Sequence, residues 1–201
     1  MHKITFQDLA VTPWKNGAGT TRQILIHPAD ATLDNFAFRV SAADINALGP
    51  FSNYAGIHRS LAVLTGQGLT LAMADGERVT FTPKHTIVDF DGAAAPSTLA
   101  YAEPILDIGV MSRMGHYRHR FSQHHYACQQ THHLSARHGL LLSLHPQPVT
   151  FRSQGLTLVL APFDAVAFQH DAHFQLACAQ SKQAPLPFFV AQFEPFSDPA
   201  K

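Results

Sequence analysis

The sequence predicts an all-β protein, because short apolar runs dominate it and helical periodicity is weak. Runs of about four to seven apolar residues recur at spacings of about 8 to 15 residues, and Gly, Pro, Asp or Asn separates them. Short strands at such spacings, joined by turn residues, are typical of a β-sandwich or a β-barrel.

An internal echo predicts how the strands are grouped. Residues 67–71 read Gln-Gly-Leu-Thr-Leu, and residues 154–158 repeat the same five letters 87 positions later. A repeat in a strand-rich chain indicates two copies of one β-module. We therefore expect two small barrels, residues 1–115 and 116–201, which pack tightly because no flexible linker separates them.

The expected strands follow the apolar runs in chain order. Residues 36–41 and 78–82 alternate apolar and polar side chains, which is the pattern of a half-buried strand. Asp75-Gly76 between two runs predicts a hairpin turn. Residues 42–48 and 132–138 each fit a single turn of helix. The full set of expected strands is 23–27, 36–41, 61–64, 69–73, 78–82, 87–90, 105–111, 140–144, 156–160, 166–168, 174–177 and 188–193.

Residues 13–22 read Pro-Trp-Lys-Asn-Gly-Ala-Gly-Thr-Thr-Arg and are expected to form an ordered loop. Two glycines weaken both a helix and a strand interior. Ordered loops of this kind serve where backbone approaches a ligand closely. The alternative is a structural turn in which Trp14, the one Trp of the chain, fills the core.

A strand over residues 38–41 brings Arg39 and Ser41 to one face. If that face is the barrel interior, the cation must be paired or bound to a ligand, because an unpaired buried charge is very costly. The alternative is that both side chains face solvent. Arg59 follows a turn-rich loop, and Asp44 is a candidate to orient Arg39 or Arg59 through a bidentate pair.

The run after residue 106 offers a second polar face. Alternation places Asp107, Gly109, Met111 and Arg113 on one side of a strand. A polar face with a small glycine suits the wall of a pocket, and it also suits an exposed edge strand.

Composition excludes several classes of function. Fourteen basic and fourteen acidic residues give a formal net charge of zero, and no long basic run occurs, so we expect no nucleic-acid partner. No segment resembles a signal peptide or a transmembrane helix, and Cys128 and Cys178 lie far apart, so a cytoplasmic location is expected. The low charged fraction of 14% and the fifteen Phe residues leave a homodimer open.

The fourteen histidines do not form the usual metal motif of a β-barrel, which is His-x-His, then a Glu, then a later His. His119 is followed by Arg120. His124-His125 and His132-His133 are adjacent pairs, and adjacent side chains on a strand point in opposite directions. We therefore expect no metal and no cofactor.

Six segments occur in a characteristic order along the chain: Pro-Trp-Lys-Asn-Gly-x-Gly at 13–19, Phe-Arg-Val-Ser-x-Ala-x-Ile at 38–45, Gly-Pro-Phe-Ser at 49–52, Gly-Ile-x-Arg at 56–59, Leu-x-Gly-x-Gly-Leu-x-Leu at 64–71 and Val-Met-Ser-Arg at 110–113. In this order they resemble the HutD/Ves family of bacterial cupin-like proteins. The resemblance covers about the first 115 residues, whereas the C-terminal half is similar only in general pattern. Gly109 stands where the family often has Asn, and residues 80–91 depart from the family's Pro-Phe-x-Phe-x-Gly-Asp stretch.

The resemblance implies a bicupin, two RmlC-like jelly-roll modules in one chain, in agreement with the internal echo. HutD members accompany histidine-degradation genes and are thought to limit that pathway by binding a small acid such as N-formylglutamate. Ves members are linked to stress. No established catalytic activity is implied, so we expect a non-catalytic regulator of histidine utilisation. The alternatives are a cupin enzyme, either an isomerase or a metal-dependent oxygenase, and a stress-response protein of the Ves branch.

From this resemblance and the residue chemistry, we expect the N-terminal barrel to bind a small anionic metabolite. Arginine suits a carboxylate because its planar fork donates two parallel hydrogen bonds. Asn16 both donates to and accepts from an amide, which fits a formamide group. No catalytic residue is expected. The expected ligand-binding residues are Trp14, Lys15, Asn16, Gly17, Arg39, Ser41, Asp44, Arg59, Met111 and Arg113.

Overall fold

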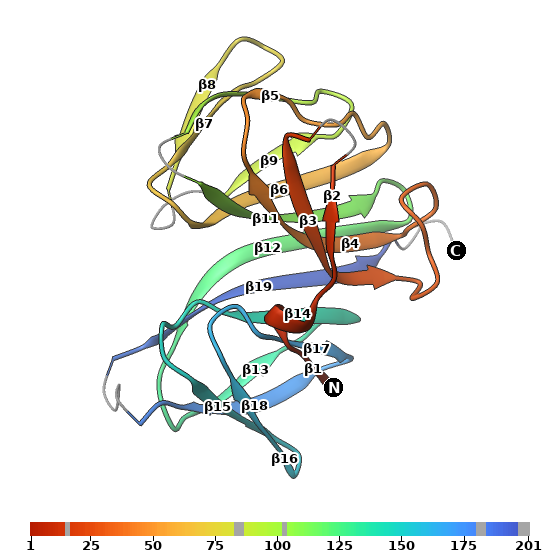
Figure 1. Cartoon of the computed structure of the whole chain (residues 1–201). Helices are drawn as coiled ribbons and strands as arrows, with labels where there is room; N and C mark the ends of the chain where they lie inside the picture. Colours follow the sequence, from red (N-terminus) through yellow and green to blue (C-terminus); the bar gives the residue numbers. More distant parts are fainter. Residues whose placement is uncertain (15–16, 83–86, 102–103, 180–183, 197–201) are drawn as a thin grey trace. The chain divides into compact units, whose positions relative to one another are not determined.

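The computed structural model describes residues 1–14, 17–82, 87–101, 104–179 and 184–196, and strands dominate it (Figure 1). Over these ranges the helical structure consists of one short 3-10 turn, Phe6–Asp8. The prediction of an all-β protein is confirmed. Among the same residues, no helix is long and apolar enough to span a membrane.

The two expected helical turns are wrong. Strand β4 (Phe38–Ile45) runs through the first of them, and β13 (Thr131–Leu134) covers the start of the second. β4 is hydrogen-bonded on both sides, to β3 (Gly19–His27) and β11 (Ile105–Arg113). Such pairing outweighs the modest helix propensity of a few alanines.

Contacts divide the chain into two compact units, residues 9–118 and residues 1–8 together with 119–201. The unit of residues 9–118 holds a six-stranded sheet and a four-stranded sheet. The six-stranded sheet has the order β2 (Val11–Pro13), β3, β4, β11, β6 (Ile57–Thr65) and β9 (Val88–Asp91), and the four-stranded sheet has the order β5 (Gly49–Pro50), β10 (Ser97–Tyr101), β7 (Leu69–Ala72) and β8 (Arg78–Phe81).

The expected hairpin at Asp75-Gly76 is confirmed. It joins β7 to β8, which pair in antiparallel register. Gly76 has a φ of +87°, a conformation that glycine adopts without steric cost, and its amide donates to the Met73 carbonyl at 3.0 Å.

The second unit holds a five-stranded and a four-stranded sheet. The first eight residues belong to it, because their strand pairs with residues 165–167. Its sheets have the orders β1 (His2–Ile4), β17 (Ala165–Gln169), β14 (His138–Ser143), β19 (Leu186–Pro195) and β12 (Tyr117–Tyr126), and β13, β18 (Ala172–Ala177), β15 (Val149–Ser153) and β16 (Leu156–Leu160).

The two sets of strands share one connectivity, but the internal echo does not relate equivalent strands. Strands β4 to β11 form the orders β4-β11-β6-β9 and β5-β10-β7-β8, and strands β12 to β19 form β12-β19-β14-β17 and β13-β18-β15-β16. By this order β7 corresponds to β15 and β8 to β16. Leu69 begins β7 whereas Leu156 begins β16, so the 87-residue echo is out of register and does not support the modules. The expected division into two cupin modules, residues 1–115 and 116–201, stays a prediction.

Each unit has its own apolar core. In the unit of residues 9–118, the core faces of the two sheets contribute Ile45, Leu61, Val63, Leu69 and Phe81, and Trp14 packs against them. In the other unit, the core is built largely from aromatic and branched residues of β15, β17, β18 and β19.

Candidate functional site

The central strand of the six-stranded sheet brings two predicted arginines together. Met111 on β11 lies directly opposite Arg39 on β4 and directly opposite Arg59 on β6. Partners opposite each other in antiparallel strands share a face, so all three side chains lie on one side of the sheet. β4 and β6 each lie one strand spacing from β11, so the backbones of Arg39 and Arg59 are about 10 Å apart.

The neighbouring rows continue this face toward the core. Gly109 lies opposite Ser41 and Leu61, and Asp107 lies opposite Ala43 and Val63. Leu61 and Val63 belong to the apolar core, which identifies the face as the interior one. The interior therefore receives an acid, a glycine and a methionine in succession from β11.

Arg39 is a buried cation with one polar partner. Its side chain is 8% exposed, and its Nε donates to Oε1 of Gln23 at 3.2 Å. Within the described part of the chain, Gln23 is the only hydrogen-bond partner found for this guanidinium. Burial lowers the pKa of Arg39, and Tyr54 opposes that shift. A desolvated guanidinium favours an anion nearby.

Arg59 is buried in an aromatic cage. Its exposed fraction is 5%, and its Cζ lies 4.9 Å from the centre of the Phe90 ring, 5.4 Å from Phe51 and 5.5 Å from Tyr54. Its Nη1 donates to the Ser52 carbonyl at 3.1 Å. Burial lowers the pKa of Arg59 and the nearby Arg39 lowers it further, whereas Asp107 and Tyr54 raise it. The cage and the carbonyl hold the guanidinium in one orientation.

Asp107 is a functional candidate that was not among the predicted binding residues. It is 2% exposed, and burial raises its pKa to about 7, against the opposing effects of Arg59 and the Ala43 amide. The alternation along β11 had placed it on the correct face. Asp107 was not counted among the binding residues because an acid is not expected beside arginines in a site for an anion.

Gly109 leaves room on this face. The residue is buried, and a Cβ built on it would meet a single described heavy atom within 4 Å, Cδ1 of Leu61 at 3.9 Å. Ser41 borders the same position from β4. A methyl group at this buried backbone position would fit without overlapping a described atom, so the interior face is loosely filled beside Ser41 and one row away from the two arginines.

Asp44 faces away from the arginines, so its suggested pairing with Arg39 or Arg59 is wrong. Its Oδ2 accepts from Nη1 of Arg22 at 2.6 Å and from Oγ1 of Thr20 at 2.9 Å. Arg39 and Asp44 are separated by an odd number of positions on one strand, and alternation therefore sends their side chains to opposite faces.

Arg113 binds the loop that precedes β4. Its Nε donates to the Phe36 carbonyl at 3.0 Å, and its Nη2 donates to the Asp34 carbonyl at 2.8 Å. Its Cζ also lies 5.6 Å from the centre of the Phe36 ring. These contacts give Arg113 a structural role. Met111, in contrast, is buried beneath the two cations and packs with Phe36.

The loop predicted over residues 13–22 is wrong at both ends, because Pro13 ends β2 and residues 19–22 belong to β3, where pairing between the two strands satisfies their backbone groups. Nε1 of Trp14 donates to Oγ1 of Thr21 at 2.7 Å, and the Gly17 amide donates to the Trp14 carbonyl at 3.0 Å. A Cβ at Gly19 would overlap the Asp44 carbonyl oxygen, so this close approach requires glycine. The predicted ligand-binding residues Lys15 and Asn16 lie outside the described residues.

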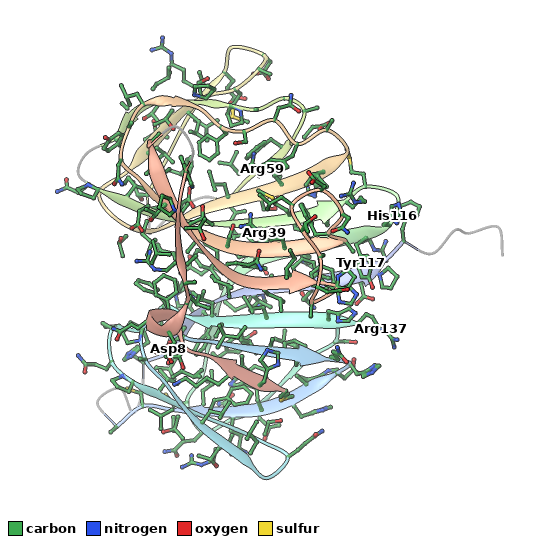
Figure 2. All side chains as sticks on the ribbon, turned by 45° about the vertical axis from the view of Figure 1, so that its right-hand side comes forward. Asp8, Arg39, Arg59, His116, Tyr117 and Arg137 are labelled. Atoms are coloured by element: carbon green, nitrogen blue, oxygen red, sulfur yellow. The ribbon has the colours of Figure 1, made fainter. Side chains whose placement is uncertain are left out.

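A surface depression of about 690 Å³ lies in the other unit and contains none of the predicted site residues. Its wall includes Ser135, Arg137, Asp171 and Glu194, and it is open to solvent. Exposed groups of mixed charge are well hydrated without a ligand. We therefore place the candidate site at the buried arginines, which lie in the unit of residues 9–118 (Figure 2).

Comparison with known proteins agrees with the sequence motifs. The HutD family model matches residues 6–186. An uncharacterised 21.2 kDa protein of the hutC 3′ region of Pseudomonas putida is 40% identical over 88 residues, which are 44% of this chain and 43% of that protein. Protein Ves of Citrobacter koseri is 32% identical over 114 residues, 56% of this chain and 58% of that protein. The matches span about half the length of these two relatives.

Solved structures are similar over nearly the whole chain. A conserved protein of unknown function from Pseudomonas aeruginosa PAO1 has a TM-score of 0.81 at 26% identity, covering 96% of this chain and 98% of that one. HutD from Pseudomonas fluorescens SBW25 has a TM-score of 0.79 at 22% identity, covering 98% and 99%. A cupin 2 barrel domain protein from Leptotrichia buccalis has a TM-score of 0.61 at 7% identity, covering 96% of each chain. The last two show the fold alone, which is cupin-like.

Proposed function

The chain belongs to the HutD family, and from that premise we propose that it is a non-catalytic, cytoplasmic protein that binds a small carboxylate and thereby regulates histidine utilisation. The ligand we propose is N-formylglutamate. The relative from the hutC 3′ region supports a link to histidine-utilisation genes. We also propose that the fold is a bicupin, which the shared strand order of the two sets of eight strands supports.

One observation carries the binding proposal: two buried arginines share an interior face on which Asp107 is the one buried acid among the described residues. Arg39 and Arg59 are 8% and 5% exposed, and neither takes part in the ion pairs found between described residues. Asp107 is the acid on that face. Buried charges are stable when they are paired, and a bound carboxylate supplies the negative charge that this face lacks.

The chemistry of the proposed ligand fits the face. N-formylglutamate carries two carboxylates and a neutral formamide. Arg39 and Arg59 offer several N–H donors in the row next to Gly109, and the Ser41 hydroxyl beside Gly109 both donates and accepts. The aromatic cage orients Arg59 before the ligand arrives, which lowers the entropic cost of binding.

Calorimetry with N-formylglutamate, urocanate and glutamate tests the proposal. A charge-assisted hydrogen bond contributes about 1.5–3 kcal/mol, so Arg39→Ala and Arg59→Ala should each weaken binding roughly tenfold to a hundredfold or more. Arg120→Ala is the matched control, because Arg120 is an exposed arginine of β12. The affinity of this variant for N-formylglutamate should equal that of the unmodified protein. Unchanged affinity in both site variants, with their circular dichroism intact, would place the site elsewhere.

The resemblance to protein Ves supports a second candidate, a stress-linked binding protein of that branch. The two candidates differ in ligand rather than in site. Under either of them we expect no metal to take part, so exhaustive treatment with a chelator should leave the affinity for the carboxylate unchanged. A loss of binding that returns with zinc, iron or nickel would favour a cupin enzyme instead.

A further inference from the structure

The carboxylate site has a buried acid at one end. Along β11, Asp107, Gly109 and Met111 alternate onto the interior face, so Gly109 separates the acid from the residue that lies between the two arginines. The buried position of Gly109 thus lies between the row of Asp107 and the row that holds the two arginines, and a Cβ there would meet only Leu61 among the described atoms. A ligand there is within electrostatic reach of all three groups.

The charged groups around Asp107 come from several elements. Arg59 lies on β6 and favours the ionised carboxyl, as does the Ala43 amide on β4. Asp44, which projects from the other face of β4, disfavours it. Arg39 lies on the same interior face, and the Tyr54 hydroxyl borders both guanidinium groups. Burial is the largest influence, and it raises the pKa of Asp107 to about 7.

We propose that Asp107 makes the site selective for ligands with two carboxylates, by taking up one proton when such a ligand binds. This inference rests on the proposed function, because it concerns the same site. The step is a simple protonation: a proton moves from solvent to an Oδ atom of Asp107, and no covalent bond of the ligand changes.

Charge balance explains the selectivity. Two arginines carry two positive charges, which two ligand carboxylates neutralise only if Asp107 is uncharged. With Asp107 ionised, three negative charges would face two positive ones in a desolvated interior. A protonated Asp107 also has an O–H that donates a hydrogen bond to the ligand. A ligand with one carboxylate balances the site with Asp107 ionised and needs no proton.

The sign of the pH dependence follows from linkage. The negative ligand raises the pKa of Asp107 above its value of about 7 in the empty site. Below about pH 7, Asp107 is protonated in both the empty and the ligand-bound site, so the affinity for the ligand is constant. Above it, each pH unit should lower the affinity for a dicarboxylate by up to about tenfold, until the pKa of the bound state is passed.

Calorimetry at pH 7.5 in phosphate and in Tris measures the proton directly, because the two buffers differ in ionisation enthalpy. Binding of N-formylglutamate should take up about half to three quarters of a proton, because a pKa of about 7 leaves Asp107 roughly one quarter protonated in the empty site at this pH. Binding of N-formylglutamine, which has one carboxylate, should take up almost none. Asp107→Asn should abolish the buffer dependence and keep the affinity level between pH 6 and 8.5. Asp89→Asn, an exposed acid on β9, is the control and should behave as the unmodified protein.

The unmodified protein alone decides the question, so a variant that fails to fold does not leave it open. Binding of N-formylglutamate by the unmodified protein with equal heats in the two buffers would overturn the role of Asp107 and leave the proposed function standing. Absence of binding by either formyl compound at any pH would overturn the proposed function itself.

Discussion

Alternation along a strand decides which side chains can meet, and at the residue scale it predicts much of the candidate site. It places Arg39 with Ser41, and Asp107 with Met111, as the structure does. It also separates Arg39 from Asp44, which the suggested ion pair overlooked. The convergence of β4 and β6 on the two sides of β11 depends on long-range pairing, which no local pattern reveals.

Replacing either of two buried glycines by alanine should have different effects on stability and on ligand binding. A Cβ at Gly139 would overlap the Phe168 ring, whereas a Cβ at Gly109 meets only Leu61 at 3.9 Å among the described atoms. Gly139→Ala should therefore lower the free energy of unfolding by about 1–3 kcal/mol through overpacking. Gly109→Ala should change it by less than about 1 kcal/mol and instead weaken carboxylate binding by occupying the site. Urea denaturation and calorimetry measure the two effects, and equal losses of stability would contradict the space inferred above Gly109.

At the scale of elements, apolar runs locate many of the buried strands and miss strands in which polar residues interrupt the run. Strand β12 was not expected, because His, Arg, Ser and Gln dominate it and leave no apolar run. Strands β10 and β15 were also missed. The out-of-register echo has a related cause: a Gly-Leu-Thr-Leu sequence suits any strand that follows a tight turn, and so carries little information about position.

The first strand is attached to its unit by one buried acid. Asp164 is 1% exposed; it pairs with Nζ of Lys3 at 2.8 Å and accepts the amides of Phe6 and Ala161, each at 2.9 Å. Asp164→Ala leaves two amides without their acceptor and removes the carboxylate partner of Lys3, whose ammonium still donates to the Val159 carbonyl at 2.7 Å. The free energy of unfolding should therefore fall by roughly 2–4 kcal/mol. Asp75→Ala, in the exposed β7–β8 turn, should cost far less. Similar losses in the two variants, measured in urea, would show that Asp164 does not anchor the strand.

At the scale of the whole molecule, two cores in one chain mean that a single free energy of unfolding is not defined in advance. The one Trp resolves this difficulty. Trp14 packs against the core of the unit of residues 9–118, so its fluorescence reports the unfolding of the unit that holds Asp107. Whether the chain forms a homodimer stays a prediction, and sedimentation equilibrium tests it.

The stability of that unit should depend on pH through Asp107. Its pKa is about 7 in the folded state and near 3.8 when unfolded, so the folded state holds one more proton between these values. The free energy of unfolding should therefore fall as pH rises from about 4 to about 7, by on the order of 4 kcal/mol over the full window, relative to Asp107→Asn. Urea titrations followed by Trp14 fluorescence at pH 5, 6, 7 and 8 measure the difference between the two proteins. A difference that stays constant across this range would show that Asp107 is ionised throughout, and that the arginines outweigh its burial.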